Sequence, residues 1–149
     1  MFRGRYETTV DAKGRTSLPA RFREALAADE ETQMVLTTAL EPCIVAYTYT
    51  DWMAFEKKLA EKPGFEEDIV RFKRRFVSSA VDCAVDGHGR ILIPPTLRKY
   101  AGIKKKVVWS AMLDKVELWD ADRLAEFESH DNDPAEIARM REAVTRYGL

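Results

Sequence analysis

Two segments decide how this chain is interpreted: Val10-Asp-Ala-Lys-Gly-Arg-Thr-Ser-Leu-Pro-Ala-Arg-Phe-Arg23 and Val85-Asp-Gly-His-Gly-Arg-Ile-Leu-Ile-Pro-Pro-Thr-Leu-Arg98. They are 75 residues apart and share six of fourteen positions, whereas unrelated segments of this length would share about one. A weaker match at an offset of 72 residues pairs 35–39 with 107–111, and 43–47 with 115–119. The chain is therefore predicted to contain two copies of one unit.

Each copy begins with a tight turn between two short strands. Alternating or β-branched residues, at 6–10 and 15–18, flank the turn Asp11-Ala-Lys-Gly14, and this pattern predicts a β-hairpin. The second copy has equivalent flanks at 83–85 and 90–93. Gly14 and Gly89 are the expected positive-φ positions, because glycine adopts that conformation without a steric penalty.

A helix and a second pair of strands are predicted after each turn. Pro19 and Pro94 end the returning strand and suit the start of a helix, and Gly102 is expected to end the second helix. The predicted ranges are helices at 19–28 and 94–101, and strand pairs 34–38 with 44–47 and 106–111 with 116–119. The order strand, strand, helix, strand, strand, found twice, predicts an α+β fold.

Helical annexes follow both units. Asp51 is expected to cap one helix, and apolar residues recur at helical spacing from Phe65 to Ala80. In the second half, Asp120 is expected to cap a helix over 121–129, and Pro134 to start another. We interpret the apolar stripes as core or oligomer contacts. The predicted organisation is a first unit at 5–50, a helical annex at 51–80, a second unit at 81–123 and a C-terminal annex at 124–149.

Length and composition exclude several classes of protein. With 149 residues, 46% apolar and 33% charged, the chain can form one domain and is too apolar for wholesale disorder. No apolar run reaches the roughly 18 residues of a membrane span, and no signal peptide is recognisable, so a cytoplasmic location is expected. Cys43, Cys83, His88 and His130 show no metal or catalytic spacing. We therefore expect core cysteines, no metal, no cofactor and no catalysis.

Charge is segregated along the chain although the net charge is −1. Residues 1–26 hold six basic and three acidic residues, and residues 87–113 hold six basic residues and no acid. Residues 114–136 hold nine acids and two bases. This asymmetry suggests a surface that faces a polyanion, although a run of charge can also be an ordinary solvated face.

The two turns carry the residues with the clearest chemistry. Asp11 and Arg15, like Asp86 and Arg90, stand four residues apart, so the carboxylate can bond turn amides while the guanidinium projects from the returning strand. One interpretation is that each pair only locks its turn. The other is that each turn is the tip of a two-stranded ribbon that presents its arginine to DNA, with Lys13 or His88 beside it. A ribbon fits the major groove, where arginine can bind phosphate or guanine.

The turn motifs, and the opening Phe2-Arg-Gly-Arg-Tyr-Glu, resemble those of the MraZ family, bacterial proteins built of two AbrB-like (SpoVT-AbrB) domains. The resemblance covers essentially the whole chain. It implies swapped-hairpin β-barrel units, a ring-like homo-oligomer, and sequence-specific binding to double-stranded DNA with tandem repeat sites. It also implies regulation of the division and cell-wall gene cluster, including the protein's own promoter, and association with the nucleoid.

The resemblance also implies a set of site residues. The family motif maps directly onto Asp11, Arg15, Asp86 and Arg90, with Gly14 and Gly89 structuring the turns. Arg3, Arg5, Lys13 and His88 are added by their position beside the motif. His88 departs from Lys13 of the first copy, and its turn is expected to bind less strongly because histidine is only partly charged at neutral pH.

Multivalency reconciles DNA binding with a slightly anionic chain. One turn offers few phosphate contacts, but several identical turns on one oligomer can raise affinity by ~10²–10⁴ on tandem sites. The alternative from a different class is an interaction module of AbrB fold, such as an antitoxin that neutralises a protein partner. The sequence does not distinguish a repressor from an activator, because the effect on transcription depends on where the DNA site lies relative to the promoter.

Overall fold

The computed structural model describes residues 2–149, and it confirms the predicted order of elements in both copies. The first unit contains β1 (Phe2–Thr9), β2 (Arg15–Ser17), α1 (Ala20–Ala28), β3 (Gln33–Thr38) and β4 (Ile44–Thr48). The second contains β5 (Val81–Ala84), β6 (Arg90–Leu92), α4 (Pro95–Ala101), β7 (Lys106–Leu113) and β8 (Val116–Asp120). Gly102 ends α4 in the left-handed conformation, as predicted, with a φ of 61°.

Further helices extend the two units: α2 (Tyr49–Ala60), α3 (Glu67–Phe76), α5 (Ala121–Ser129) and α6 (Pro134–Arg146), with a 3-10 turn at His130–Asn132. Asp120 caps α5 as predicted and accepts a hydrogen bond from the Arg123 N–H at 3.2 Å. The prediction for Asp51 is wrong, because Thr48 is the cap and accepts the Asp51 N–H at 3.1 Å. Threonine and aspartate both cap well, so the end of β4 decides where α2 begins.

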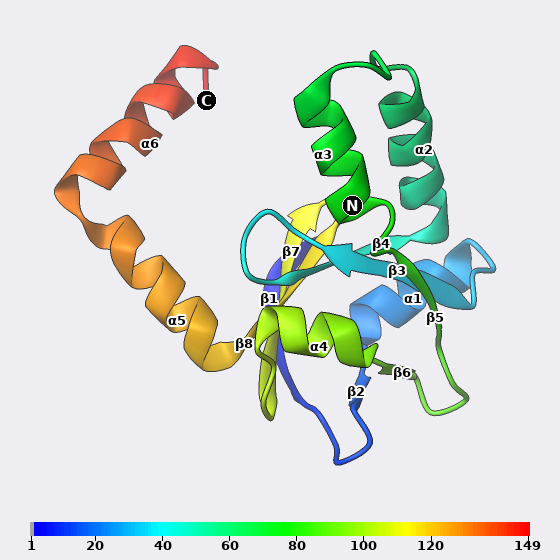
Figure 1. Cartoon of the computed structure of the whole chain (residues 1–149). Helices are drawn as coiled ribbons and strands as arrows, with labels where there is room; N and C mark the ends of the chain where they lie inside the picture. The colour runs from blue at the N-terminus through cyan, green and yellow to red at the C-terminus, as the bar shows by residue number, and fades with distance from the viewer. Residues whose placement is uncertain (1) are drawn as a thin grey trace.

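One antiparallel sheet, in the order β1-β7-β8-β4-β3-β5, forms the centre of the molecule, and β2 pairs with β6 in a separate two-stranded ribbon (Figure 1). The two units contribute to the same sheet, since β1 pairs with β7 and β3 pairs with β5. The ribbon also joins the units, because β2 belongs to the first and β6 to the second. The two sequence repeats therefore form one structure rather than two separate bodies.

The hairpins predicted across the two turns are wrong in their strand pairing, whereas the predicted pairs β3 with β4 and β7 with β8 are confirmed. β1 pairs over eight positions with β7, from Phe2 opposite Leu113 to Thr9 opposite Lys106. β2 is only three residues long and pairs with β6 instead. A long strand gains more ladder hydrogen bonds and cross-strand contacts from a partner of equal length than from a three-residue strand. Pairing between units therefore replaces pairing across each turn, while β3 with β4 and β7 with β8 pair within their own units.

Two apolar clusters cover the two faces of the large sheet. On one face, α1, α4 and the ribbon pack on the sheet, and the buried side chains include Phe22, Ile91, Leu97 and Trp109. On the other face, α2, α3 and α5 contribute Trp52, Phe76 and Leu124. β4 is buried along its whole length, as expected for a strand covered on both faces. The first cluster contains residues of both units, so neither unit has this core alone.

Cys43 and Cys83 are buried free thiols, as predicted, with exposures of 0% and 5%. Burial raises the pKa of Cys83 to about 11, so this thiol stays protonated at neutral pH. Within residues 2–149, no helix combines the length and the apolar character that a membrane crossing requires.

Candidate nucleic-acid interface

The first turn (Asp11–Arg15) and the second turn (Asp86–Arg90) are built in the same way. The Asp11 N–H donates to Arg15 O at 2.8 Å, and the Gly14 N–H donates to Asp11 O at 3.0 Å. In the second turn, the Asp86 N–H donates to Arg90 O at 2.9 Å, and the Gly89 N–H donates to Asp86 O at 3.0 Å. Gly14 has a φ of 87° and Gly89 a φ of 74°, the conformation that favours glycine.

Each aspartate binds its own turn and its own arginine. Asp11 Oδ1 accepts the N–H groups of Lys13 and Arg15, both at 2.9 Å, while Oδ2 accepts Arg15 Nε at 2.9 Å. Asp86 makes the equivalent bonds to His88 and Arg90 at 2.8 to 3.0 Å. In the described part of the chain, no hydrogen bond engages the Nη atoms of either arginine. The ion pair therefore orients each guanidinium and leaves its outer edge available for a bidentate contact.

The ribbon brings the two turn arginines close together. Arg15 lies opposite Leu92, and Ser17 lies opposite Arg90, so both arginines share one face as diagonal neighbours about 7–8 Å apart. Thr16 and Ile91 point the other way and are buried. The turns leave opposite ends of the ribbon at the lower edge of the molecule in Figure 1. The structure thus places both arginine motifs on one exposed surface, but through a ribbon shared by the two units.

Each turn is also supported by the other unit. The Leu18 N–H donates to Gly89 O, and the Ile93 N–H donates to Gly14 O, both at 2.9 Å. A Cβ built on Gly14 would lie 2.5 Å from the guanidinium of Arg98, and one on Gly89 would lie 2.6 Å from Arg23. An arginine of the opposite unit therefore packs against each glycine, but the end of an arginine side chain is flexible, so the positive φ remains the reason for glycine at these positions.

Arg23 and Arg98 are candidate site residues that were not predicted from the sequence. Arg23 lies on α1 and Arg98 on α4, and each covers the turn of the other unit. The signal was present, because these arginines are the last identical pair of the fourteen-residue repeat. Both lie within the helices predicted at 19–28 and 94–101, and only the pairing between units shows which turn each one covers.

Arg3 and Arg5 are not brought to the turns. Both lie on β1, where Arg5 is four residues from the end of the strand, or about 13 Å along it. Arg5 forms a two-bond ion pair with Glu128 of α5, with N–O distances of 2.7 and 2.5 Å. The hydrogen bonds from Arg5 lower the pKa of Glu128. Arg5 thus ties α5 to β1 in this structure, while Lys13 and His88 remain exposed in their turns.

The turn carboxylates give a testable pH dependence. Hydrogen bonds from the backbone N–H of the arginine four residues on are the largest cause that lowers the pKa of Asp11 and of Asp86. Because the folded-state pKa is lowered, the turn is stabilised above about pH 4 and loses this stabilisation as the pH falls through the lowered value. We expect NMR titrations of the side-chain carboxyl groups to give pKa values for Asp11 and Asp86 that are lower than the pKa of aspartate in an unfolded chain.

Arg15→Ala tests this assignment, with Asp86 as the internal control. The variant loses the side-chain hydrogen bond and the positive charge of Arg15 but keeps the backbone N–H of residue 15, so the pKa of Asp11 should rise in part while that of Asp86 stays unchanged. Complete return of Asp11 to the value of an unfolded chain would contradict the backbone hydrogen bond as the main cause.

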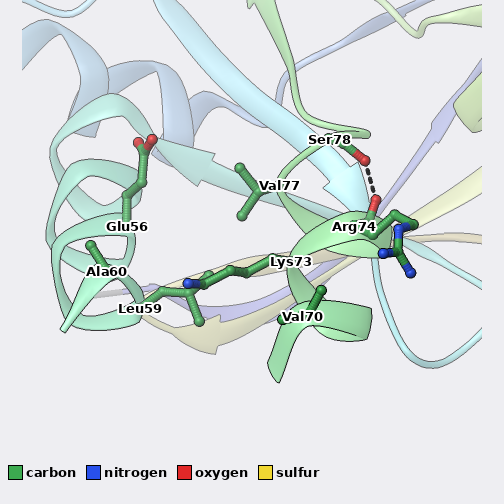
Figure 2. Close-up of a pocket in the computed structure, with 8 residues that line it drawn as sticks. All are labelled: Glu56, Leu59, Ala60, Val70, Lys73, Arg74, Val77 and Ser78. Carbon is green, nitrogen blue, oxygen red and sulfur yellow. Dashed lines mark hydrogen bonds between the residues drawn. The ribbon is translucent and has the colours of Figure 1, made fainter. Parts of the chain in front are cut away.

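Apolar surface is left uncovered elsewhere in the chain. A hollow of about 450 Å³ lies between α2 and α3 and is lined by the apolar Leu59, Ala60, Val70 and Val77 together with four polar residues. Figure 2 shows these side chains. The apolar stripe of α6 is exposed, with 48% exposure at Met140 and 46% at Val144, and α6 stands away from the sheet in Figure 1. The stripe on α3 is a core contact, through Phe72 and Phe76, whereas that on α6 contributes nothing to the core.

These features define the class of protein. The chain is a duplicated α+β protein with an exposed β-ribbon that carries two oriented arginines, the type of surface with which ribbon proteins bind DNA.

Comparison with known proteins identifies the family. The MraZ family model, described as "MraZ protein, putative antitoxin-like", matches residues 1–75 and again 76–146. A protein of Azotobacter vinelandii named transcriptional regulator MraZ is 42% identical over 123 residues, which are 82% of this chain and 81% of that protein. A protein of the same name from Desulforapulum autotrophicum is 38% identical over 149 residues, the full length of both. The chain belongs to the MraZ family.

Proposed function

We propose that this chain is a DNA-binding transcriptional regulator whose ribbon contacts DNA through Arg15 and Arg90. The observation that carries the proposal is their convergence on one face of the ribbon, each with Nε held by an aspartate and, within residues 2–149, with no hydrogen bond at its Nη atoms. The names of the relatives support the regulatory role. Catalysis is no part of the proposal.

The ribbon would enter the major groove of double-stranded DNA. The groove admits a two-stranded β-ribbon, and an arginine with two available N–H groups can bind O6 and N7 of guanine together. Lys13 and His88 stand beside these arginines and would contact phosphates, which position the protein without reading sequence. Gly14 and Gly89 keep the turns tight, so that no side chain displaces the arginines from the groove.

Assembly supplies the affinity that one subunit lacks. We infer a ring-like homo-oligomer of swapped-hairpin barrels, in which the α6 stripe of one copy packs into the α2/α3 hollow of the next. A heterologous contact of this type closes into a ring when the rotation allows. Several ribbons on one face would then engage tandem boxes in the promoter of the division and cell-wall gene cluster, including the protein's own. The cytoplasm and nucleoid are the expected location.

Binding to the DNA upstream of the protein's own gene tests this function. Fragments with one box and with several tandem boxes are titrated across a range of salt concentrations. We expect affinity to rise by ~10²–10⁴ from one box to several and to fall steeply with salt. A scrambled sequence of equal length is the control. Equal affinity for one box and several contradicts the multivalent mechanism, and co-purification of a small protein partner without DNA binding favours the antitoxin alternative.

A further inference from the structure

A basic segment lies directly beside the first turn. Lys104–Lys106, which we call the lysine segment, connects α4 to β7, and all three side chains are exposed. Lys105 O accepts the Val10 N–H at 2.7 Å, one residue before the turn, and Lys106 is the ladder partner of Thr9. The backbone of the segment is thus fixed at the base of the first turn.

At the second turn, the chain just before the equivalent place is acidic. The Val85 N–H donates to Thr32 O at 2.9 Å, as Val10 does to Lys105. The residues before Thr32 are Asp29, Glu30 and Glu31, which we call the acidic segment. Glu31 also lines a hollow of about 350 Å³ that is bordered by the second turn. The two turns are alike in backbone and hydrogen bonding. The positions that these hydrogen bonds match are Lys104–Lys106 at the first turn and 31–33 at the second, which hold Glu31 and no lysine, with Asp29 and Glu30 just before them.

Charge of opposite sign has opposite effects near DNA. Each lysine that neutralises a phosphate releases a condensed counterion, and this release drives binding. A carboxylate at the same distance repels the phosphates. The backbone contacts also set the register and direction of a protein on the duplex, so an asymmetry between the turns gives the ribbon a direction on the DNA.

We propose that the lysine segment is a further DNA-contacting element, which binds backbone phosphates and makes the first turn the principal contact of each subunit. The inference rests on the proposed function. The acidic segment weakens the second turn, and the difference breaks the approximate symmetry of the two units. Each subunit therefore binds its box in one orientation.

The triple variant Lys104→Gln/Lys105→Gln/Lys106→Gln tests the element in the full-length protein. We expect the slope of log K against log[salt] to become shallower by about 2–3 for each engaged subunit, and the affinity at moderate salt to fall about tenfold or more. The matched control is Lys57→Gln/Lys58→Gln/Lys62→Gln, which removes three exposed lysines at α2. Circular dichroism checks that both variants are folded.

Two further variants test the asymmetry. Asp29→Asn/Glu30→Gln should tighten binding, with Glu31 kept because its carboxylate accepts the N–H groups of Tyr49 and Thr50 at the start of α2. Arg15→Ala should weaken binding more than Arg90→Ala. Wild-type protein that binds no DNA overturns the proposed function and this inference with it. Wild-type binding together with an unchanged slope in the triple variant, or an equal loss in the α2 control, overturns this inference alone.

Discussion

Replacing both turn arginines, in the variant Arg15→Ala/Arg90→Ala, is expected to abolish binding to tandem promoter boxes at moderate salt. Each bidentate arginine contributes about 1–3 kcal/mol, so losing both from a subunit weakens it by about 30-fold to more than 10⁴-fold. Every subunit of the oligomer carries the two substitutions, so the loss of affinity at each box multiplies with the losses at the other boxes. Gel-shift titration against salt measures the effect.

The fold and the assembly should survive this double substitution. Both arginine side chains are about a third exposed, at 32% and 31%, and the carboxylates keep their hydrogen bonds to the turn amides. The control Arg71→Ala/Arg139→Ala removes two arginines that form exposed ion pairs on α3 and α6, with the same change in net charge. Loss of the oligomer on a sizing column, with unchanged binding per folded subunit, would show that Arg15 and Arg90 only lock their turns.

The largest effect on stability is expected at Phe22. This α1 side chain is fully buried and makes edge contacts with Phe2, Tyr6 and Trp109, with ring centroids 5.1, 5.5 and 5.9 Å apart. Phe22→Ala removes these contacts and leaves a cavity between the sheet and α1, which costs about 3–5 kcal/mol. This is a large share of the roughly 5–15 kcal/mol that stabilises a domain. Urea unfolding followed by tryptophan fluorescence measures the change in the free energy of unfolding.

Phe65→Ala is the matched control, because Phe65 is 90% exposed and the same atoms are removed from the surface. It should leave the free energy of unfolding within about 0.5 kcal/mol of the wild type. Equal unfolding curves for the Phe22 and Phe65 variants would contradict the packing of α1 on the sheet. The Phe22 variant should also affect the second turn, since the next residue, Arg23, covers Gly89.

Local features were predictable because their causes lie within a few residues. The order of strands and helices follows from periodicity and from the prolines and glycines between elements. Positive φ at Gly102 and the cap at Asp120 depend only on adjacent backbone groups. The Asp51 prediction failed where two good caps stood three residues apart, and the end of β4 settled the choice in favour of Thr48.

The Asp–Arg motif of each turn could be predicted from the sequence, because the hydrogen bonds that close each turn join residues four positions apart or fewer. That the two motifs would meet on one ribbon could not be predicted, because the choice of strand partners depends on ladder length and burial summed over the whole chain. The same long-range choice places Arg98 over the first turn, directs Arg5 to Glu128, and sets lysines beside one turn and acids beside the other. Sequence separation carries no information about such contacts, so the three-dimensional packing decided which charges surround each arginine.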